Sequence, residues 1–230
     1  MNEKKLRISI IVPTLNEANN LAPTLQTLQA FRRRGCELIV VDGGSHDATA
    51  TLATPLVDQL IHAKRGRARQ MNAGANNSKG DVLWFLHADT LPPATADALI
   101  CQALQHHKWG RFDVRLSGHQ LLLRSIETMM NIRSRITKIA TGDQGIFVHR
   151  TSFDQIGGYP DIPLMEDIAF CTALRRLGPP ACLEQCVQTS SRRWESKGII
   201  RTILLMWWLR FLFFWGIPPS QLVKLYYRDR

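Results

Sequence analysis

The chain has 230 residues and a mass of 26.1 kDa, which suits one domain with a tail and argues against two independent catalytic domains. Hydrophobic residues make up 45% of the sequence and charged residues 21%, which excludes a long disordered segment. The net charge of +10 favours an anionic partner, such as nucleic acid, a phosphorylated ligand or an acidic lipid surface.

The N-terminal apolar run at residues 8–12 is stopped by Pro13 and is too short for a secretion signal. The five cysteines are scattered and lack the spacing of a zinc site. These two features predict reduced thiols and a protein that stays in the cytoplasm.

The first half of the chain alternates short β-branched runs with helical stretches, which is typical of parallel strands joined by crossover helices. We predict strands at residues 8–12, 37–41, 59–62 and 82–86. Apolar residues recur at helical spacing between the first two strands, and Ser45 with Asp47 suits the start of the next helix. The pattern predicts an α/β nucleotide-binding architecture.

Polar clusters follow three of the predicted strands, at residues 13–17, 42–45 and 87–89. Ligands bind beyond the carboxyl ends of strands in open α/β sheets, so we expect these clusters to meet in one crevice. For any single cluster, ordinary turn and capping chemistry is the alternative interpretation. Their joint placement favours the crevice.

The pattern becomes less regular after residue 89. We predict, in order, a helix at 92–107, a strand at 112–116, a helix at 120–140, a turn and strand at 142–148, and a helix at 163–177.

Six short motifs occur in one order: PTLNE at 13–17, VVDGGSHDAT at 40–49, GRARQMNAG at 66–74, HAD at 87–89, GDQGIF at 142–147 and ED at 166–167. Over residues 8–200 the chain thereby resembles glycosyltransferase family 2, and in particular its small bacterial members with the HAD variant. The resemblance implies an inverting enzyme with the GT-A fold, a Rossmann-like mixed sheet flanked by helices. We expect residues 1–198 to form this catalytic domain and 199–230 to form an apolar helix with a basic tail.

A nucleotide-diphosphate sugar, UDP- or GDP-linked, would need carboxylates for its base and ribose and positive charge for its diphosphate. The resemblance implies contacts to this donor from Pro13, Thr14, Asn16, Glu17, Asp42, Gly43, Arg67, Gln70, His87 and Ala88. For Arg67 the alternative is that it is an ordinary charged side chain on the solvent-exposed surface of a helix.

Asp89 matches the last acid of the family's DxD metal motif. The resemblance implies that Asp89 holds a divalent cation, Mn²⁺ or Mg²⁺, which also binds the donor diphosphate. His87 stands where the family has the first acid, and imidazole suits manganese better than magnesium. The alternative is that His87 only caps the end of the strand.

An inverting transfer needs one base to take the proton of the acceptor hydroxyl. The resemblance gives this role to Asp167, although Glu166 and Asp167 could simply favour a helix N-terminus. It also implies acceptor-side positions at Asp143, Gln144, Gly145, Glu166, Arg193 and Trp194. Arg193 and Trp194 would meet the diphosphate and a sugar ring, and a plain surface loop is the alternative.

Residues 199–217 are the most apolar stretch and hold three of the six tryptophans, but Arg201 and Arg210 interrupt it. An arginine at the bilayer centre costs about 2.5–3.5 kcal/mol. We therefore rank a helix lying on the lipid surface first, a buried or oligomer-forming helix second, and a span third. The expected partners are the inner face of the cell membrane and a lipid or small-molecule acceptor, and no nucleic acid.

Two rival functions are weaker. A dinucleotide-dependent oxidoreductase needs G-x-G-x-x-G after the first strand, where this chain has residues 13–17. A non-catalytic nucleotide-, nucleic-acid- or membrane-binding protein would leave Asp42, Asp89 and Asp167 unexplained.

Overall fold

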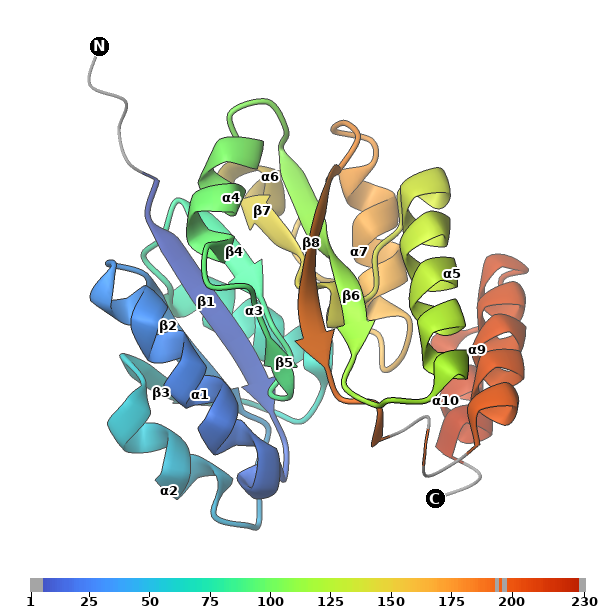
Figure 1. Cartoon of the computed structure of the whole chain (residues 1–230), viewed down its shortest axis with the longest axis horizontal. Helices are drawn as coiled ribbons and strands as arrows, with labels where there is room; N and C mark the ends of the chain where they lie inside the picture. Colours follow the sequence, from blue (N-terminus) through green and yellow to red (C-terminus); the bar gives the residue numbers. More distant parts are fainter. Residues whose placement is uncertain (1–5, 193–194, 196–197, 228–230) are drawn as a thin grey trace.

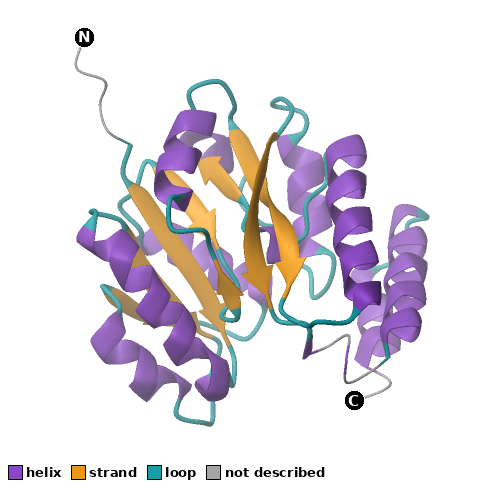
Figure 2. Ribbon diagram, in the orientation of Figure 1, coloured by secondary structure: helices purple, strands orange, loops and turns teal. Residues whose placement is uncertain are grey.

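A computed structural model describes residues 6–192, 195 and 198–227. In this part of the chain eight strands form one mixed sheet, in the order β3-β2-β1-β4-β7-β6-β8-β5. Helices cover both faces of the sheet (Figure 2). The predicted mixed α/β sheet is therefore confirmed.

The N-terminal half of the sheet is parallel and ends in the predicted polar clusters. Its strands are β1 (Ile8–Thr14), β2 (Glu37–Asp42), β3 (Gln59–His62) and β4 (Val82–Phe85), each within two residues of its predicted bounds. The register pairs Thr14 with Asp42, so the first two clusters lie side by side. The connections are α1 (Ala18–Arg33), α2 (Thr49–Ala53), the 3-10 turn η1 (Thr54–Leu56) and α3 (Arg67–Asn77).

The C-terminal half reverses direction at β7 (Phe147–His149), which pairs antiparallel with both β4 and β6 (Trp109–Leu116). The remaining elements are β5 (Thr90–Leu91), α4 (Ala96–Ala103), α5 (Leu121–Thr137), η2 (Gly142–Gln144), α6 (Arg150–Gln155), α7 (Glu166–Leu174), β8 (Ala181–Thr189), α9 (Ile199–Phe214) and α10 (Pro219–Tyr227). The sequence did not predict β8. A register shift opposite Phe112 and Asp113 leaves residues 184–186 exposed, which breaks the alternation of buried and exposed positions.

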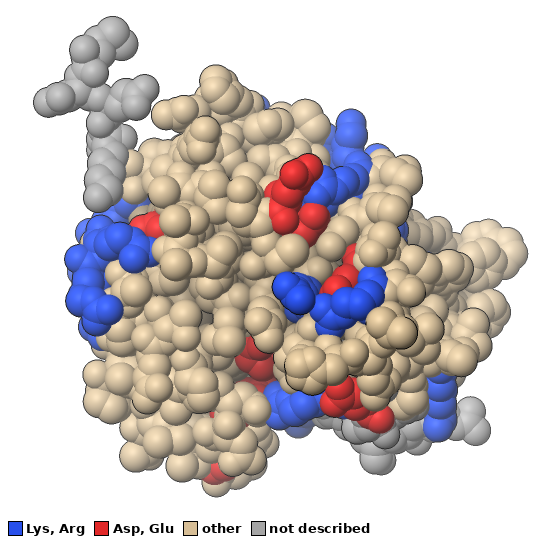
Figure 3. Space-filling view, viewed as in Figure 1, with Lys and Arg blue, Asp and Glu red and all other residues tan. Residues whose placement is uncertain are grey.

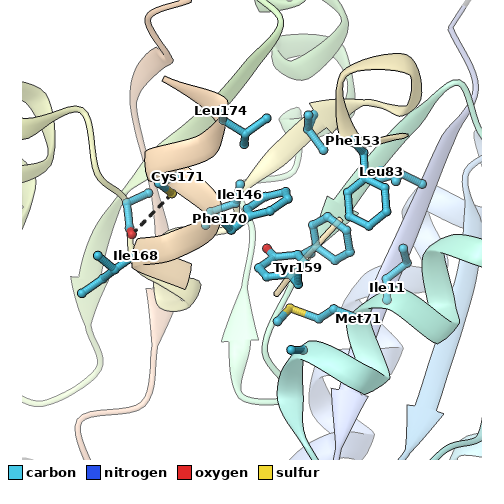
Figure 4. Packing of buried hydrophobic residues seen from close by; sticks show 14 of the residues in the cluster. Ile11, Met71, Leu83, Ile146, Phe153, Tyr159, Ile168, Phe170, Cys171 and Leu174 are labelled. Atoms are coloured by element: carbon cyan, nitrogen blue, oxygen red, sulfur yellow. Dashed lines mark hydrogen bonds between the residues drawn. The ribbon is translucent and has the colours of Figure 1, made fainter. Parts of the chain in front are cut away.

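Alternate residues of each parallel strand enter different cores on the two faces of the sheet. One core packs Ile10 and its neighbours against α1, α2 and α4. The other packs Ile11 against α3, α6, α7, α9 and α10. Within the second core, the Tyr159 ring stacks on Phe170 of α7 at 3.8 Å and meets Phe85 edge-on at 5.0 Å (Figure 4). This aromatic packing fixes the N-terminus of α7 beyond the end of β4.

The C-terminal helices α9 and α10 lie beside α5, at the end of the molecule opposite β3 (Figure 1). Leu209 and Leu222 are fully buried in the same core as Ile11, so this segment shares its core with the rest of the chain. Among the described residues, no helix has both the length and the apolarity needed to cross a bilayer. One face of α9 packs inward and the other is exposed.

Candidate active site

A cavity of about 570 Å³ opens beyond the ends of β4 and β8, between α5, α7 and α9. Its charged and titratable lining comes from segments far apart in the sequence: Arg67, His87, Asp89, Arg133, Asp143, Glu166, Asp167 and Arg210. Asp89 and Asp167 therefore share one cavity, as predicted. Asp42 is not in its lining, but its strand lies two places from β4 on the same sheet edge.

Asp89 lies in the loop after β4 and is linked to the end of β1 by an arginine. Arg192 Nη2 lies 3.5 Å from Asp89 Oδ2 and 3.6 Å from Glu17 Oε2. One guanidinium thus bridges the predicted metal acid and a predicted donor-binding acid. Sequence analysis had considered only the neighbouring Arg193 and Trp194, which lie outside the described residues.

His87 is enclosed beside the backbone of Gly142. A Cβ atom at position 142 would lie 2.5 Å from His87 Nε2, so glycine allows the close approach. Burial and the nearby Arg67 lower the pKa of His87 to about 3. The ring is therefore neutral at physiological pH, the form in which imidazole ligates metals.

The described residues could supply only part of the ligand shell of a metal ion. Among the described residues, no group of three or more His, Cys, Asp and Glu side chains could hold an ion. Asp89 supplies a carboxylate, a hard ligand suited to Mg²⁺ or Mn²⁺. These donors fit a cation that takes further oxygen ligands from a bound diphosphate, and do not fit a closed, all-protein metal centre.

The predicted acid pair begins α7, where Met165 adopts a left-handed conformation with φ of 66°. Asp167 Oδ2 accepts a hydrogen bond from Gly142 N at 3.0 Å, and Oδ1 accepts one from Ile168 N at 2.8 Å. Glu166 is buried. Its burial and the adjacent Asp167 raise the pKa of Glu166 to about 7, against the opposing charge of Arg67. Glu166 and Asp167 thus begin a helix and also line the cavity.

The loop from Thr141 to Gly145 contributes less to the cavity than its sequence predicted. Asp143 lines the cavity, and burial raises the pKa of its carboxyl group. Gln144 is fully buried and donates from Nε2 to Ser134 Oγ at 3.1 Å. Gly145, with φ of 59°, packs toward the core. Gln144 and Gly145 therefore shape this loop and do not line the cavity, and their acceptor-side position stays a prediction.

At the other end of the edge, the predicted donor residues hold one another in place. The Asp42 carboxylate accepts hydrogen bonds from Gly44 N at 3.1 Å, Ser45 N at 3.0 Å and the Ser45 hydroxyl. Gln70 Nε2 donates to the carbonyl oxygens of Thr14 at 2.7 Å and Val41 at 2.8 Å. Gln70 is buried and so supports the strand ends.

The other predicted donor residues fall into three groups. Asn16, with φ of 55°, accepts the His46 N–H at 2.9 Å and orders the loop after β2. The Gly43 N–H donates to the Thr14 carbonyl, and Ala88 is buried in the core that packs on α1. Pro13 and Arg67 line a second, much smaller cavity that His87 and Asp167 also border.

Residues 9–152 match the model of glycosyl transferase family 2. The chain is 25% identical to the probable glycosyltransferase YdaM of Bacillus subtilis, over 98% of this chain and 68% of that protein. It is 32% identical to an undecaprenyl-phosphate 4-deoxy-4-formamido-L-arabinose transferase of Pseudomonas fluorescens, over 42% of this chain and 32% of that protein.

Solved structures resemble the fold. A mannosyltransferase from Pyrobaculum calidifontis, in complex with GDP-Man and Mn²⁺, superposes with a TM-score of 0.64 and 20% identity, over 80% of this chain and 57% of that one. S. aureus TarS with UDP-GlcNAc superposes with a TM-score of 0.66 and 16% identity, over 80% and 58%. The chain thus spans little more than half of these two structures. Because the family model covers more than half of the chain, the protein belongs to glycosyl transferase family 2 and has the GT-A fold of these glycosyltransferases.

Proposed function

We propose that the protein is an inverting glycosyltransferase that moves a sugar from a UDP- or GDP-linked donor to an acceptor hydroxyl. The observation that carries this proposal is the shared cavity, which brings Asp89 together with the carboxyl groups of Glu166 and Asp167. Asp89 suits a cation, and Glu166 and Asp167 suit a base. Transfer between two bound molecules needs the cation and the base in the same place.

For the donor, we infer that the nucleotide lies along the ends of β1 and β2 and its diphosphate near Asp89. Glu17 and Asp42 would meet ribose and base, and Arg67 and Arg192 would face the diphosphate. GDP-Man with Mn²⁺ and UDP-GlcNAc in the structures named above support a nucleotide sugar as the ligand class. A divalent cation held by Asp89 would neutralise charge on the departing diphosphate. The neutral imidazole of His87, two residues before Asp89, would be the second protein contact of this cation.

For the base, we infer Asp167. Two backbone N–H groups orient its carboxylate, and each oxygen keeps a second lone pair for the acceptor hydroxyl. Glu166 would lie on the acceptor side of the same site, next to Asp167. Inversion follows if the hydroxyl attacks from the face opposite the diphosphate.

For the location, we infer a peripheral position on the inner face of the cell membrane. The outer face of α9 exposes large apolar side chains: Ile200, Leu204, Trp207, Trp208, Phe211 and Phe214, followed by Trp215. Tryptophans on such a face favour the lipid interface. In the space-filling view the right-hand edge, where α9 lies, shows few charges, whereas Lys and Arg side chains gather in a patch at the left edge (Figure 3).

The test is thermal unfolding with UDP, GDP or NAD, with and without Mn²⁺. A ligand at 100 times its Kd adds about 2.7 kcal/mol to the free energy of unfolding. We expect stabilisation by UDP or GDP that increases with Mn²⁺, followed by release of sugar from the matching donor. Stabilisation by NAD alone would reject the proposal.

A further inference from the structure

Two arginines that belong to none of the six sequence motifs line the cavity, on the side where we infer that the acceptor binds. Arg133 comes from α5 and Arg210 from α9, and both line the cavity. Arg133 Nη1 donates to the carbonyl oxygen of Ile139 at 3.2 Å. Its Nε and Nη2 atoms are buried and have no hydrogen-bond partner within the described part of the chain. Among the described residues, neither arginine has a carboxylate within 4 Å.

This arrangement carries unfavourable electrostatic energy. Burial, with the positive charge of Arg210, lowers the pKa of Arg133 to about 10, so the side chain stays charged at neutral pH. A buried donor without a hydrogen-bond partner destabilises the folded state, and a charged one does so more strongly. An anion bound between the two guanidinium groups would remove this cost.

The nearby carboxylates do not bond directly to these guanidinium groups. The negative charges of Asp143 and Asp167 oppose the lowering of the Arg133 pKa, but among the described residues neither carboxylate lies within 4 Å of Arg133 or Arg210. Asp143 bonds to Thr141, and its Oδ1 is buried without a partner. Burial raises the pKa of Asp143, which favours its neutral form. Thus Arg133 and Arg210 remain available to a ligand that enters the cavity.

The walls beside these arginines are apolar and continue to the surface. The apolar lining comes from two helices: Met129 and Met130 of α5, and Ile203, Met206 and Trp207 of α9. Met129 is 41% exposed and Trp207 is 60% exposed, so the apolar lining reaches the outer face that carries the tryptophans. A ligand with an anionic group inside and an apolar chain pointing outward would match this gradient.

We propose that Arg133 and Arg210 form a phosphate subsite for the acceptor, and that the acceptor is an amphiphile in which phosphate links a hydroxyl-bearing headgroup to an apolar chain. This inference rests on the proposed function, because phosphate at this place would leave the headgroup facing Asp167. Guanidinium forks bind phosphate through paired hydrogen bonds, a geometry that lysine cannot provide. The apolar chain would leave between α5 and α9 toward the lipid.

The experiment measures binding to the full chain by calorimetry with three probes: dodecyl phosphate, dodecyl maltoside and inorganic phosphate, each alkyl probe below its micelle concentration. We expect dodecyl phosphate to bind at least about tenfold more tightly than either other probe, the ratio that one charged hydrogen bond supplies. Arg210→Gln and Arg133→Gln should each remove that preference and leave dodecyl maltoside binding unchanged. Arg201→Gln, on α9 but outside the cavity lining, is the matched control and should keep it.

Because Arg133 is partly buried, Arg133→Lys serves as a second variant that keeps the charge and should retain part of the preference. Preference kept in both Gln variants would overturn the subsite, and equal binding of inorganic phosphate would overturn the amphiphile. Binding of UDP and GDP with Mn²⁺ is measured on the same samples. Unchanged nucleotide binding by the Gln variants supports a subsite separate from the donor. A wild-type chain that binds no nucleotide fails the proposed function instead, whatever its affinity for dodecyl phosphate.

Discussion

The two halves of the sheet edge differ in how their polar side chains are satisfied. At the ends of β1 and β2, the proposed donor half, Asp42 accepts three hydrogen bonds and Gln70 bridges two strand ends. Around the cavity beside α5 and α7, the proposed acceptor half, Arg133 and Asp143 keep buried atoms that have no hydrogen-bond partner among the residues described. Glu166 there has a pKa raised to about 7. Satisfied groups make a rigid platform, whereas unsatisfied groups store interaction energy for a ligand. The contrast suggests a preformed donor end and an acceptor end that is completed by binding.

Asp167→Asn should have the largest effect. The amide keeps the shape of the side chain but cannot accept the proton of the hydroxyl, so turnover should fall by about 100- to 10,000-fold. UDP or GDP binding should stay within about twofold of wild type, because the donor half is untouched. Sugar transfer and nucleotide binding are measured on the same preparation. Normal turnover would take the base role away from Asp167.

Asp89→Ala tests the junction between the halves. Without this carboxylate the cation loses its predicted protein ligand, so the Mn²⁺-dependent part of nucleotide stabilisation should disappear, up to about 2.7 kcal/mol at 100 times Kd. The metal-independent part should remain. Thermal unfolding with and without Mn²⁺ separates the two. Asp161→Ala, which removes an exposed partner of Arg69, is the control and should keep the full metal effect.

Glu166 gives the acceptor half a pH dependence. Its folded pKa is raised above the ordinary 4.5, mainly by burial, so the native state holds a proton that the unfolded chain releases. This contribution is fully present below pH 4.5 and is lost as pH rises toward about 7. Its slope is at most about 1.4 kcal/mol per pH unit. Glu166→Gln should flatten the curve of unfolding free energy in that window, and an unchanged curve would contradict the assignment.

Sequence patterns predicted the donor half of the molecule better than the acceptor half. β1, β2 and β4 are buried parallel strands that end in polar clusters, so both the strands and the residues at their ends carry local signals. No local sequence signal marks Arg133 and Arg210, since their proximity depends on how α5 and α9 pack against each other. The burial of Gln144 had no local signal either, because it depends on a capping box that Gln144 forms with Thr141.

The smallest effect on stability is expected at Trp208 on the outer face of α9 and at Trp215 just after it, because neither residue lines the cavity. Trp208 and Trp215 are 54% and 76% exposed, so replacing both by serine should change the free energy of unfolding by no more than about 0.5 kcal/mol per site. Donor binding should be unchanged. Sedimentation with vesicles containing anionic lipid should fall severalfold, because interfacial tryptophans would no longer enter the headgroup layer. Leu52→Ser, an exposed apolar position on α2, is the matched control, and equal loss of vesicle binding there would mean that attraction to lipid is not a property of α9.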